Sequence, residues 1–496
     1  MAEKIDVLFI NPGDRKKTYQ DLGDEFCGIE PPVFAGLFAN YLRQHGLSSA
    51  IYDAPALYVS AEETARAASE DFDPVLIVLP VYGLQPSAST QNMGSAGRIA
   101  RLIRESGCGT PVLMTGTHPA ALPRRTMEEE AIDFLCDREG PITILETVRA
   151  LKSGARNFSN VASLWWRDGT TIVAPTTETP LIRDLDREMP GIAWDLLSMD
   201  RYRAHNWHCF DHIHQRTPYV AIHTSLGCPF KCSFCCINAP FGKPSYRMWS
   251  PESVVREIDF LVERYGVKNI KFVDEMFVLN KRHVGAICDL LAQRDYDLNI
   301  WAYARVDTAY PELLDQLRKA GFRWLCLGIE SASDYVRDGA KKLDNSAIIQ
   351  TVRRIQDADI KIIGNYIFGL PDDSISRMQQ TLDLAMELNC EFANFYSAMA
   401  YPGSALHTLA VEQGRELPEQ WQHFSQHSFE TKPLANEHCS AADILEFRDQ
   451  AWHRYFTNPR YLNMVLDRFG PEVLDHVRRM VAIPLRRKLL EERNAA

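Results

Sequence analysis

Residues 224–235 of the chain, TSLGCPFKCSFC, place Cys228, Cys232 and Cys235 in a C-x3-C-x2-C spacing. A loop this short can wrap three thiolates around one iron–sulfur cube and leave the fourth iron without a protein ligand, which makes that iron reactive. Structural zinc normally takes four ligands, and no fourth ligand follows in a standard spacing. Cys236 is adjacent, but neighbouring side chains diverge. The spacing therefore favours an iron–sulfur centre over a zinc site or three structural cysteines.

The composition of the chain is that of a folded protein, with 496 residues, 46% of them apolar and a net charge of −11. At about 150 residues per domain, this length predicts roughly three domains. The acidic balance disfavours a nucleic-acid partner. Twelve cysteines are too dilute for a disulfide scaffold, so the scattered ones are expected in the core.

The N-terminus and the hydropathy give an expectation about location. Residues 1–6 contain no basic region followed by an apolar stretch, so no signal peptide is expected. The most apolar run, Val75–Leu84, is about ten residues long, whereas a membrane helix needs about 20. We therefore expect a cytoplasmic protein with reduced thiols and no membrane span.

Short apolar runs alternate with helical patterns over residues 1–150. The runs are Asp6–Ile10, Ser49–Asp53, Val75–Leu79, Pro111–Thr115 and Ala131–Leu135. This alternation predicts an α/β domain with a parallel, doubly wound, Rossmann-like sheet, whose ligands bind at the carboxyl ends of the strands. No glycine-rich phosphate fingerprint follows the first run, which disfavours a nicotinamide cofactor. Residues 151–217 are predicted to be a linker that contains a hairpin.

A second set of apolar runs occupies residues 218–405. The runs are Asn269–Val273, Leu298–Ala304, Trp324–Ile329 and Ile362–Phe368. Each follows a helical stretch and ends in polar or glycine residues, so the carboxyl ends should share one rim. The pattern predicts half or more of a β/α barrel with the cysteine loop at that rim. Residues 406–496 are predicted to be a helical region that caps the barrel mouth.

The cysteine spacing, with Phe234 before the last cysteine, resembles the signature of the radical S-adenosylmethionine (SAM) enzymes. The resemblance implies a TIM-like (β/α)6 core and a [4Fe-4S] cluster on the three cysteines, which would be both metal ligands and catalytic residues. The open iron would chelate SAM, and electron transfer would cleave SAM to a 5′-deoxyadenosyl radical. By the same resemblance, the candidate SAM-binding residues are Phe234, Glu275, Arg305, Gly328, Glu330 and Phe368.

The N-terminal sheet followed by this core resembles the cobalamin-binding branch of the radical SAM enzymes. Echoes of that branch are Asn11-Pro12, Pro31-Pro32, residues 115–119 (TGTHP) and residues 138–141 (REGP). The resemblance implies that cobalamin binds over residues 1–150. The candidate cobalamin-binding residues are Asn11, Gly83, Gln85, Thr115, Gly116, His118, Glu139 and Gly140.

Three histidine observations qualify the resemblance. The D-x-H-x-x-G box is absent, because the first histidine is His45, so cobalt is expected to lack a histidine as its lower ligand. His118 has two equal interpretations, a corrin contact or a loop cap. Residues 205–214 contain four histidines, whose spacings fit no familiar metal site. We expect a polar linker there first and a substrate contact second.

The two resemblances together imply a methyltransferase. One SAM would methylate cobalamin, and a second would supply the radical that activates an unactivated substrate carbon, which then takes the methyl group from methylcobalamin. A cyclisation, ring rearrangement or oxidation is the alternative. Transfer-RNA methylthiolation is disfavoured by the acidic charge and the lack of a second cysteine trio, and a non-enzymatic cobalamin or redox sensor by the intact cysteine loop. The expected partners are a small, natural-product-like substrate and an electron donor such as flavodoxin or ferredoxin.

Overall fold

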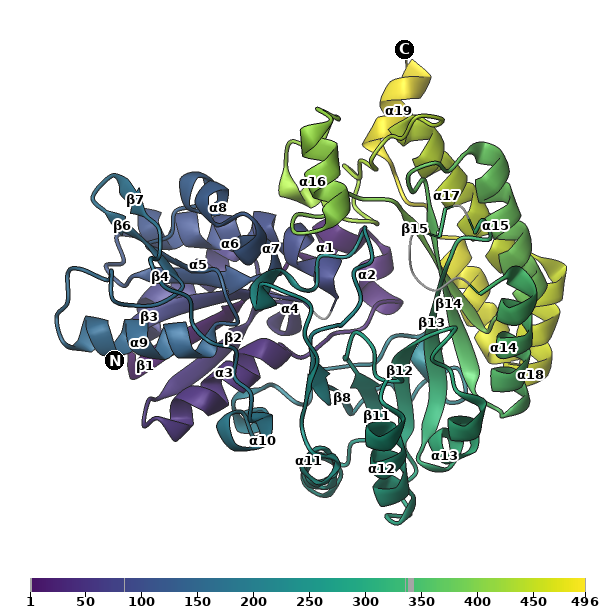
Figure 1. Cartoon of the computed structure of the whole chain (residues 1–496), viewed down its shortest axis with the longest axis horizontal. Helices are drawn as coiled ribbons and strands as arrows, with labels where there is room; N and C mark the ends of the chain where they lie inside the picture. Colours follow the sequence, from purple (N-terminus) through teal and green to yellow (C-terminus); the bar gives the residue numbers. More distant parts are fainter. Residues whose placement is uncertain (1, 84, 335, 338–342, 496) are drawn as a thin grey trace.

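The computed structural model describes residues 2–83, 85–334, 336–337 and 343–495. Two α/β units lie side by side, and helices from the C-terminal part of the chain flank the second unit (Figure 1). The first unit contains the N-terminal sheet, and the second contains a curled sheet that begins near residue 219. The cysteine loop lies between them.

The first sheet has the strand order β2-β1-β3-β4-β5-β6-β7 in the described part of the chain. The strands are β1 Glu3–Asn11, β2 Ser49–Asp53, β3 Phe72–Val81, β4 Val112–Gly116, β5 Phe134–Cys136, β6 Leu164–Asp168 and β7 Thr171–Val173. The first five are parallel, which confirms the predicted doubly wound sheet. The last two form the predicted hairpin. The hairpin is not part of a separate linker, because it pairs antiparallel with β5 and extends this sheet.

Helices cover both faces of the first sheet. Alternate residues of β1 pack on opposite sides: Val7 and Phe9 lie in a core with helix α3, and Leu8 and Ile10 lie in a core with α5 and α6. Burial on both faces explains why the strand reads as a continuous apolar run. The helices of this unit and the segment after it are α1 Arg15–Tyr19, α2 Leu22–Glu25, α3 Val33–Gln44, α4 Ala54–Leu57, α5 Ala61–Glu70, α6 Pro86–Glu105, α7 Thr117–Ala121, α8 Pro123–Glu129, α9 Pro141–Lys152 and α10 Leu185–Glu188.

The second sheet is parallel, with the order β15-β14-β13-β12-β11-β8 in the described residues, and it curls into an open half-barrel. Its strands are β8 Tyr219–Ile222, β11 Asn269–Phe272, β12 Asn299–Arg305, β13 Phe322–Glu330, β14 Lys361–Phe368 and β15 Phe392–Ser397. The four inner strands confirm the predicted barrel strands. The sequence analysis did not predict the two edge strands, β8 and β15.

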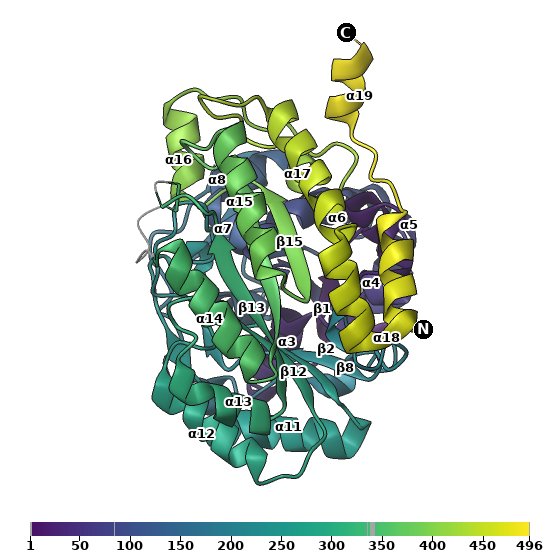
Figure 2. The same ribbon diagram turned by 90° about the vertical axis from the view of Figure 1, so that its right-hand side faces the viewer.

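Helices α11 to α16 accompany the half-barrel. They are α11 Pro251–Tyr265, α12 Lys281–Ala292, α13 Leu314–Lys319, α14 Asn345–Asp357, α15 Ile375–Leu388 and α16 Ala405–Glu412. Figure 2 shows α14 and α15 on the outer face of the sheet. The inner face is left to line cavities, which places function inside the curl.

The C-terminal helices, α17 Ala441–Phe456, α18 Pro459–Val481 and α19 Lys488–Ala495, do not form the expected cap over the barrel mouth. Instead, α17 packs along the edge strand β15, where the Arg448 Nε donates to the Phe395 carbonyl at 2.8 Å and the Tyr455 hydroxyl donates to the Cys390 carbonyl at 2.6 Å (Figure 2). An edge strand exposes unpaired backbone groups, and these helices cover them. The loop before α17 reaches the mouth, where Gln426 accepts a hydrogen bond from the Ser397 backbone.

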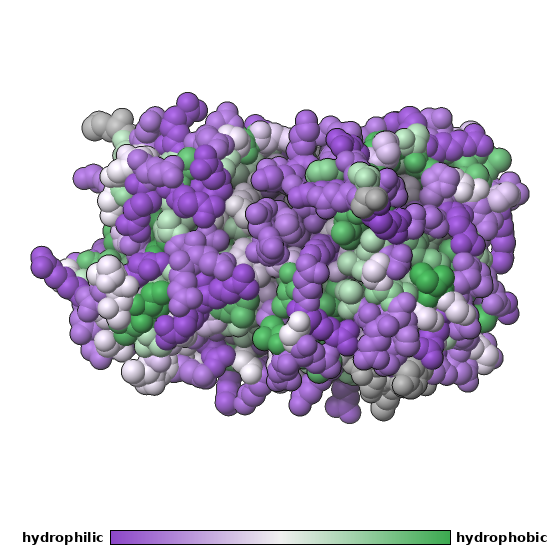
Figure 3. All heavy atoms as spheres, turned by 90° about the horizontal axis from the view of Figure 1, so that it is seen from above, coloured by the Kyte–Doolittle hydropathy of each residue, from purple (hydrophilic) through white to green (hydrophobic). Residues whose placement is uncertain are grey.

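No helix among the described residues is both long enough and apolar enough to cross a membrane. The face of the molecule in Figure 3 is mostly hydrophilic, and its apolar residues form scattered patches.

Candidate active site

The cysteine loop leaves the half-barrel directly after β8 and is closed by a small antiparallel pair, β9 Ser225–Leu226 with β10 Arg247–Met248. Gly227 stands between this pair and the first cysteine, with a φ of +84°. A Cβ on Gly227 would lie 2.7 Å from the Ser245 carbonyl oxygen, so this turn requires glycine. The turn fixes the point at which the loop enters the interior.

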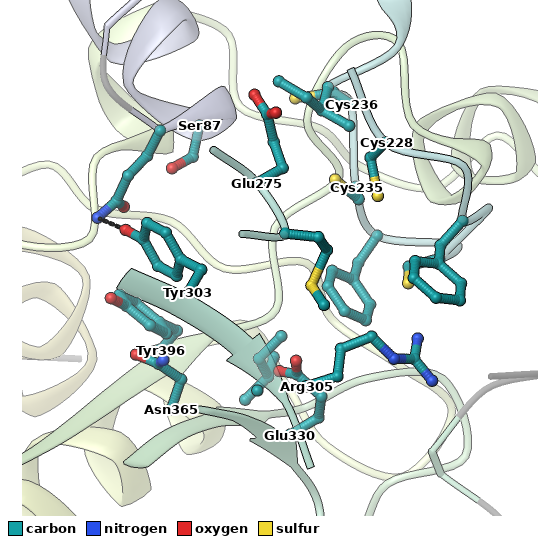
Figure 4. Close-up of a pocket in the computed structure, with 18 of the residues that line it drawn as sticks. Ser87, Cys228, Cys235, Cys236, Glu275, Tyr303, Arg305, Glu330, Asn365 and Tyr396 are labelled. Carbon is teal, nitrogen blue, oxygen red and sulfur yellow. Dashed lines mark hydrogen bonds between the residues drawn. The ribbon is translucent and has the colours of Figure 1, made fainter. Parts of the chain in front are cut away.

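Cys228, Cys232 and Cys235 all line one cavity of about 380 Å³, here called cavity A (Figure 4). Burial raises the pKa of Cys228 to about 11 and the pKa of Cys235 well above its usual range. A bound metal deprotonates such thiols, because its charge offsets the cost of burying a thiolate. In the described part of the chain, no three acidic, histidine or cysteine side chains stand in a metal-binding arrangement. Cys236 lines the same cavity.

Asp274, at the end of β11, anchors the start of the cysteine loop. Its buried carboxylate accepts hydrogen bonds from the Thr224 backbone (2.6 Å), the Thr224 hydroxyl (2.5 Å) and the Ser225 hydroxyl (2.7 Å). Burial raises the pKa of Asp274 to about 6, and the three hydrogen bonds oppose that rise. Asp274 was not among the site residues predicted from the sequence. Its role depends on the parallel pairing of β8 with β11, and the sequence analysis missed β8.

Two carboxylates at the rim of the half-barrel line cavity A, namely Glu275 after β11 and Glu330 at the end of β13. Burial raises the pKa of Glu275 to about 8 and that of Glu330 to about 7. The buried Glu275 Oε2 has no hydrogen-bond partner among the described residues. A Cβ on Gly328 would lie 2.6 Å from Glu330 Oε1, so glycine leaves room for that side chain. Buried carboxylates at a cavity wall, one of them with an oxygen that has no partner among the described residues, fit a ligand that carries an ammonium group or hydroxyls.

Arg305, at the end of β12, lies next to Glu330, and Glu275 lies apart from both (Figure 4). Its Nε and Nη2 donate to Asp307 at 2.8 and 2.9 Å, and its guanidinium lies over the Phe230 ring, 4.1 Å from the centroid. Phe234 also lines cavity A, as expected. Phe368 does not, because its fully buried ring packs on other aromatic rings in the core.

A second cavity of about 320 Å³, here called cavity B, lies between the first sheet and the inner face of the half-barrel. It is lined by the loops after β1 and β3, which are neighbouring strands whose connections leave toward opposite sides of the sheet. Such a switch point is where doubly wound sheets bind ligands. Asn11, Gly83 and Gln85 line cavity B, and the latter two also line cavity A. The Asn11 side chain donates to Asp53 at 2.8 Å.

Thr115, Gly116 and Gly140 line neither cavity, although they lie at the ends of β4 and β5. A Cβ on Gly116 would lie 2.1 Å from the Val81 carbonyl oxygen, and one on Gly140 would lie 3.0 Å from the Phe38 ring. These glycines therefore allow close packing within the first unit. Thr115 is fully buried, and its hydroxyl has no hydrogen-bond partner among the described residues.

Glu139 and His118 also stand away from both cavities. Glu139 is buried and forms an ion pair of 2.6 Å with Arg247 of β10, which joins the first sheet to the base of the cysteine loop. The fully buried His118 ring faces Thr90 at 3.2 Å and packs edge-on against Trp421, and burial lowers its pKa to about 3. Both side chains have a structural role in this structure.

Gly83 and Gln85 were predicted from the sequence and line both cavities, but further residues where the two cavities meet were not predicted. Tyr303, Asn365, Tyr396 and Gln426 line both cavities, and the first three lie together on the barrel strands in Figure 4. Gln85 of the first unit donates to the Tyr303 hydroxyl at 3.3 Å. Tyr303 lies two residues before Arg305 on the same face of β12, so strand periodicity was a signal that pointed to it. We call this place the junction.

The histidines of residues 205–214 do not converge. His205 lines cavity B, His208 is buried against the Asn299 carbonyl at 2.9 Å, and His212 and His214 are exposed. The expected linker histidines therefore serve separate roles, and of these four only His205 lines cavity A or B.

Comparisons with known proteins agree with this architecture. Residues 222–385 match the family model of the radical SAM superfamily, and residues 19–148 match that of the B12 binding domain. An uncharacterised methyltransferase of Pyrococcus horikoshii is 28% identical over 436 residues, which cover 87% of this chain and 89% of the relative. The anaerobic magnesium-protoporphyrin IX monomethyl ester cyclase of Rubrivivax gelatinosus is 26% identical over 92% of this chain and 78% of its own.

Solved structures share the fold. The cobalamin-dependent radical SAM enzyme OxsB, with aqua-cobalamin and SAM bound, has a TM-score of 0.68 at 14% identity and covers 97% of this chain and 72% of its own. The radical SAM methyltransferase TsrM of Kitasatospora setae, with cobalamin and a [4Fe-4S] cluster bound, has a TM-score of 0.64 at 18% identity and covers 92% of this chain and 82% of its own.

Proposed function

The chain is a member of the cobalamin-dependent radical SAM enzymes, and we propose that it transfers a methyl group to an unactivated carbon of a small-molecule substrate. One observation carries the proposal. The cysteine cavity and the cavity at the switch point of the first sheet share a wall at the junction. A substrate at the junction would therefore reach groups held in both cavities.

The proposal assigns the cluster to Cys228, Cys232 and Cys235. Asp274 supports the assignment, because it fixes the loop from behind through three hydrogen bonds. For SAM, the proposal assigns Glu275 and Glu330 to the ammonium group and the ribose hydroxyls. Their buried, underpaired carboxylates are the acceptors that these donors need, and a bound cation favours their ionised forms.

For cobalamin, the proposal keeps Asn11, Gly83 and Gln85, which line the switch-point cavity. The same cavity is closed from the barrel side by Tyr303 and Tyr396. When bound, the cluster with SAM supplies a radical that removes a hydrogen atom, and cobalamin supplies the methyl group. The chain itself would hold the two groups on either side of the junction and exclude water with the aromatic rings around it.

The domain division that we propose follows function: residues 1–150 for cobalamin, 151–217 as the connection, whose hairpin β6–β7 extends the first sheet, 218–405 for the cluster and SAM, and 406–496 as the helical C-terminal region. The cytoplasm would keep the thiols reduced. A flavodoxin or ferredoxin is the proposed electron donor, because reductive cleavage of SAM needs an external electron.

The methyltransferase relatives support methyl transfer, and the cyclase relative, similar over most of the chain, supports cyclisation as the second candidate. Product analysis separates the two. Anaerobically reconstituted enzyme with cobalamin, a reductant and SAM labelled in its methyl group is expected to form S-adenosylhomocysteine and a labelled product together with 5′-deoxyadenosine. Formation of 5′-deoxyadenosine with no S-adenosylhomocysteine would contradict methyl transfer.

A further inference from the structure

Helix α17 buries an arginine that lacks a counter-ion of its own. Arg448 is 4% exposed, and its Nη1 donates to Asp449 at 2.7 Å. Arg487, 3% exposed, holds the same carboxylate with Nε at 2.8 Å and Nη2 at 2.9 Å. Neither arginine pairs with another carboxylate among the described residues. Two guanidinium charges therefore share one carboxylate, and the cluster has a net charge of +1.

The two arginines differ in whether their N–H donors face a cavity that a ligand can occupy. Arg487 directs its Nη1 to the Gln426 and Ser428 carbonyls and to the Thr431 hydroxyl, so its donors are used within the protein. Arg448 lines cavity B, where its Nη2 meets the His427 Nε2 at 3.4 Å. The excess positive charge of the cluster therefore lies at the wall of cavity B.

His427 adds a neutral donor beside this charge. Because Arg448 donates to Nε2, the proton of the imidazole is on Nδ1, and the described residues offer Nδ1 no hydrogen-bond partner. Burial, followed by the two arginines, lowers the pKa of His427 well below its usual range, so the ring is neutral. Its ring lines cavity B, with the Tyr19 ring 5.7 Å away.

Two further charged groups of cavity B, Lys271 and Glu30, pair with each other. The Lys271 Nζ lies 3.2 and 3.3 Å from the two carboxylate oxygens of Glu30. His205 contacts the same carboxylate at 3.2 Å and accepts a hydrogen bond from the Gly28 backbone on Nδ1, which leaves its proton on Nε2, facing Glu30. Glu30 therefore does not compensate Arg448. A buried charge without a counter-ion is costly, and an anionic ligand removes that cost.

We propose that Arg448 and His427 form an anion subsite in cavity B, which binds a carboxylate or phosphate group of the substrate. The proposal rests on the methyl-transfer function above and names the class of substrate, an anionic small molecule. Its position suits that role, because Arg448 donates to the backbone of Phe395, the residue before Tyr396 of the junction. A substrate anchored at Arg448 extends its carbon skeleton to the junction.

Inorganic phosphate is the probe for this subsite. Holoenzyme with cluster and cobalamin is titrated with phosphate in a phosphate-free buffer by calorimetry, alongside Arg448→Gln and a control, Arg454→Gln, whose exposed side chain lies on the same helix. We expect one saturable phosphate per chain, weakened at least about tenfold by Arg448→Gln and unchanged by the control. No saturable binding, or equal binding by Arg448→Gln, overturns the proposal.

If Arg448→Gln loses its iron, His427→Phe is the second variant to titrate, because it keeps both arginines. We expect it to weaken phosphate binding about threefold or more while iron content stays unchanged. Unchanged phosphate affinity in His427→Phe overturns the role of His427.

The tail phosphate of cobalamin is the other source of an anion. Cobinamide lacks this tail, so affinities for cobalamin and cobinamide are compared in wild type and Arg448→Gln. We expect Arg448→Gln to leave both affinities unchanged, and a selective loss for cobalamin would overturn the assignment to substrate. None of these readouts requires turnover, so a failure of methyl transfer is distinguishable from a failure of the anion subsite.

Discussion

The cysteine loop and the strand ends of the first sheet differ in how many of their predicted ligand contacts line a cavity. Every predicted cluster ligand lines cavity A, and so do five of the six predicted SAM contacts. Of the eight predicted cobalamin contacts, only Asn11, Gly83 and Gln85 line a cavity. The others hold the first sheet together or join it to the loop.

The difference has a structural cause. The three cysteines lie within eight consecutive residues, so one turn at Gly227 places them all. The strand ends of a doubly wound sheet lie along a whole edge, and the ligand crevice forms at one point of that edge, between β1 and β3. Motifs at β4 and β5 therefore match the family without lining the crevice in this structure.

The largest effect is expected from removal of a cluster ligand. Cys228→Ala leaves two of the three predicted cluster ligands, so we expect loss of cluster iron and background levels of SAM cleavage. Iron analysis and the visible absorption of the cluster measure this. Cys108→Ser, in the first unit and away from both cavities, is the control that retains iron. Full iron content in Cys228→Ala would show that Cys228 is not a cluster ligand.

A substitution at Glu139 tests whether the predicted cobalamin contacts that line neither cavity have a structural role. Glu139→Ala leaves Arg247 buried without its partner, so we expect a loss of about 3–5 kcal/mol in the free energy of unfolding. The cobalamin affinity of the folded variant, measured by absorption titration, should be unchanged. Glu146→Ala breaks an exposed pair with Arg149 and should cost about 1 kcal/mol or less. Cobalamin binding weakened by Glu139→Ala alone would make Glu139 a ligand contact.

Asp274 tests how the cysteine loop is held. Asp274→Asn removes the negative charge. It also places an amide N–H donor opposite the Thr224 and Ser225 hydroxyls, which donate to the carboxylate in the wild type. We therefore expect a loss of about 2 kcal/mol in the free energy of unfolding. Cluster iron should be lost faster to a chelator than in wild type. Asp289→Asn, exposed on α12, is the control. A variant that holds iron as tightly as wild type would show that the loop is rigid without this anchor.

The smallest expected effect is on pH dependence. Burial raises the pKa of Glu330 to about 7, and a donor ligand favours the ionised form. SAM affinity should therefore rise as pH increases through 7 and fall about tenfold between pH 8 and pH 6. Glu330→Gln should flatten this part of the profile in SAM titrations at fixed ionic strength. An identical slope in wild type and variant would assign the dependence to another group, such as Glu275.

Local sequence patterns predicted much of the fold. The strand β2, for example, has the predicted bounds Ser49–Asp53 because its apolar pattern is complete within the element. The edge strands β8 and β15 were missed. β8 is four residues long beside an irregular linker, and β15 is defined by pairing with β14 rather than by its own pattern.

The sequence by itself determined the cluster chemistry, because ligand spacing within one loop is a local property that any fold carrying the loop must respect. Only the tertiary structure decided which strand-end residues face a ligand, which acids lack partners, and where cavities A and B meet. Arg448 illustrates the distinction. The residues around it in the sequence do not indicate a binding role. Its charge is left unbalanced only because the folded chain pairs Asp449 with Arg487, a residue 38 positions away. Burial and charge balance depend on contacts between distant residues, and those contacts exist only in the folded chain.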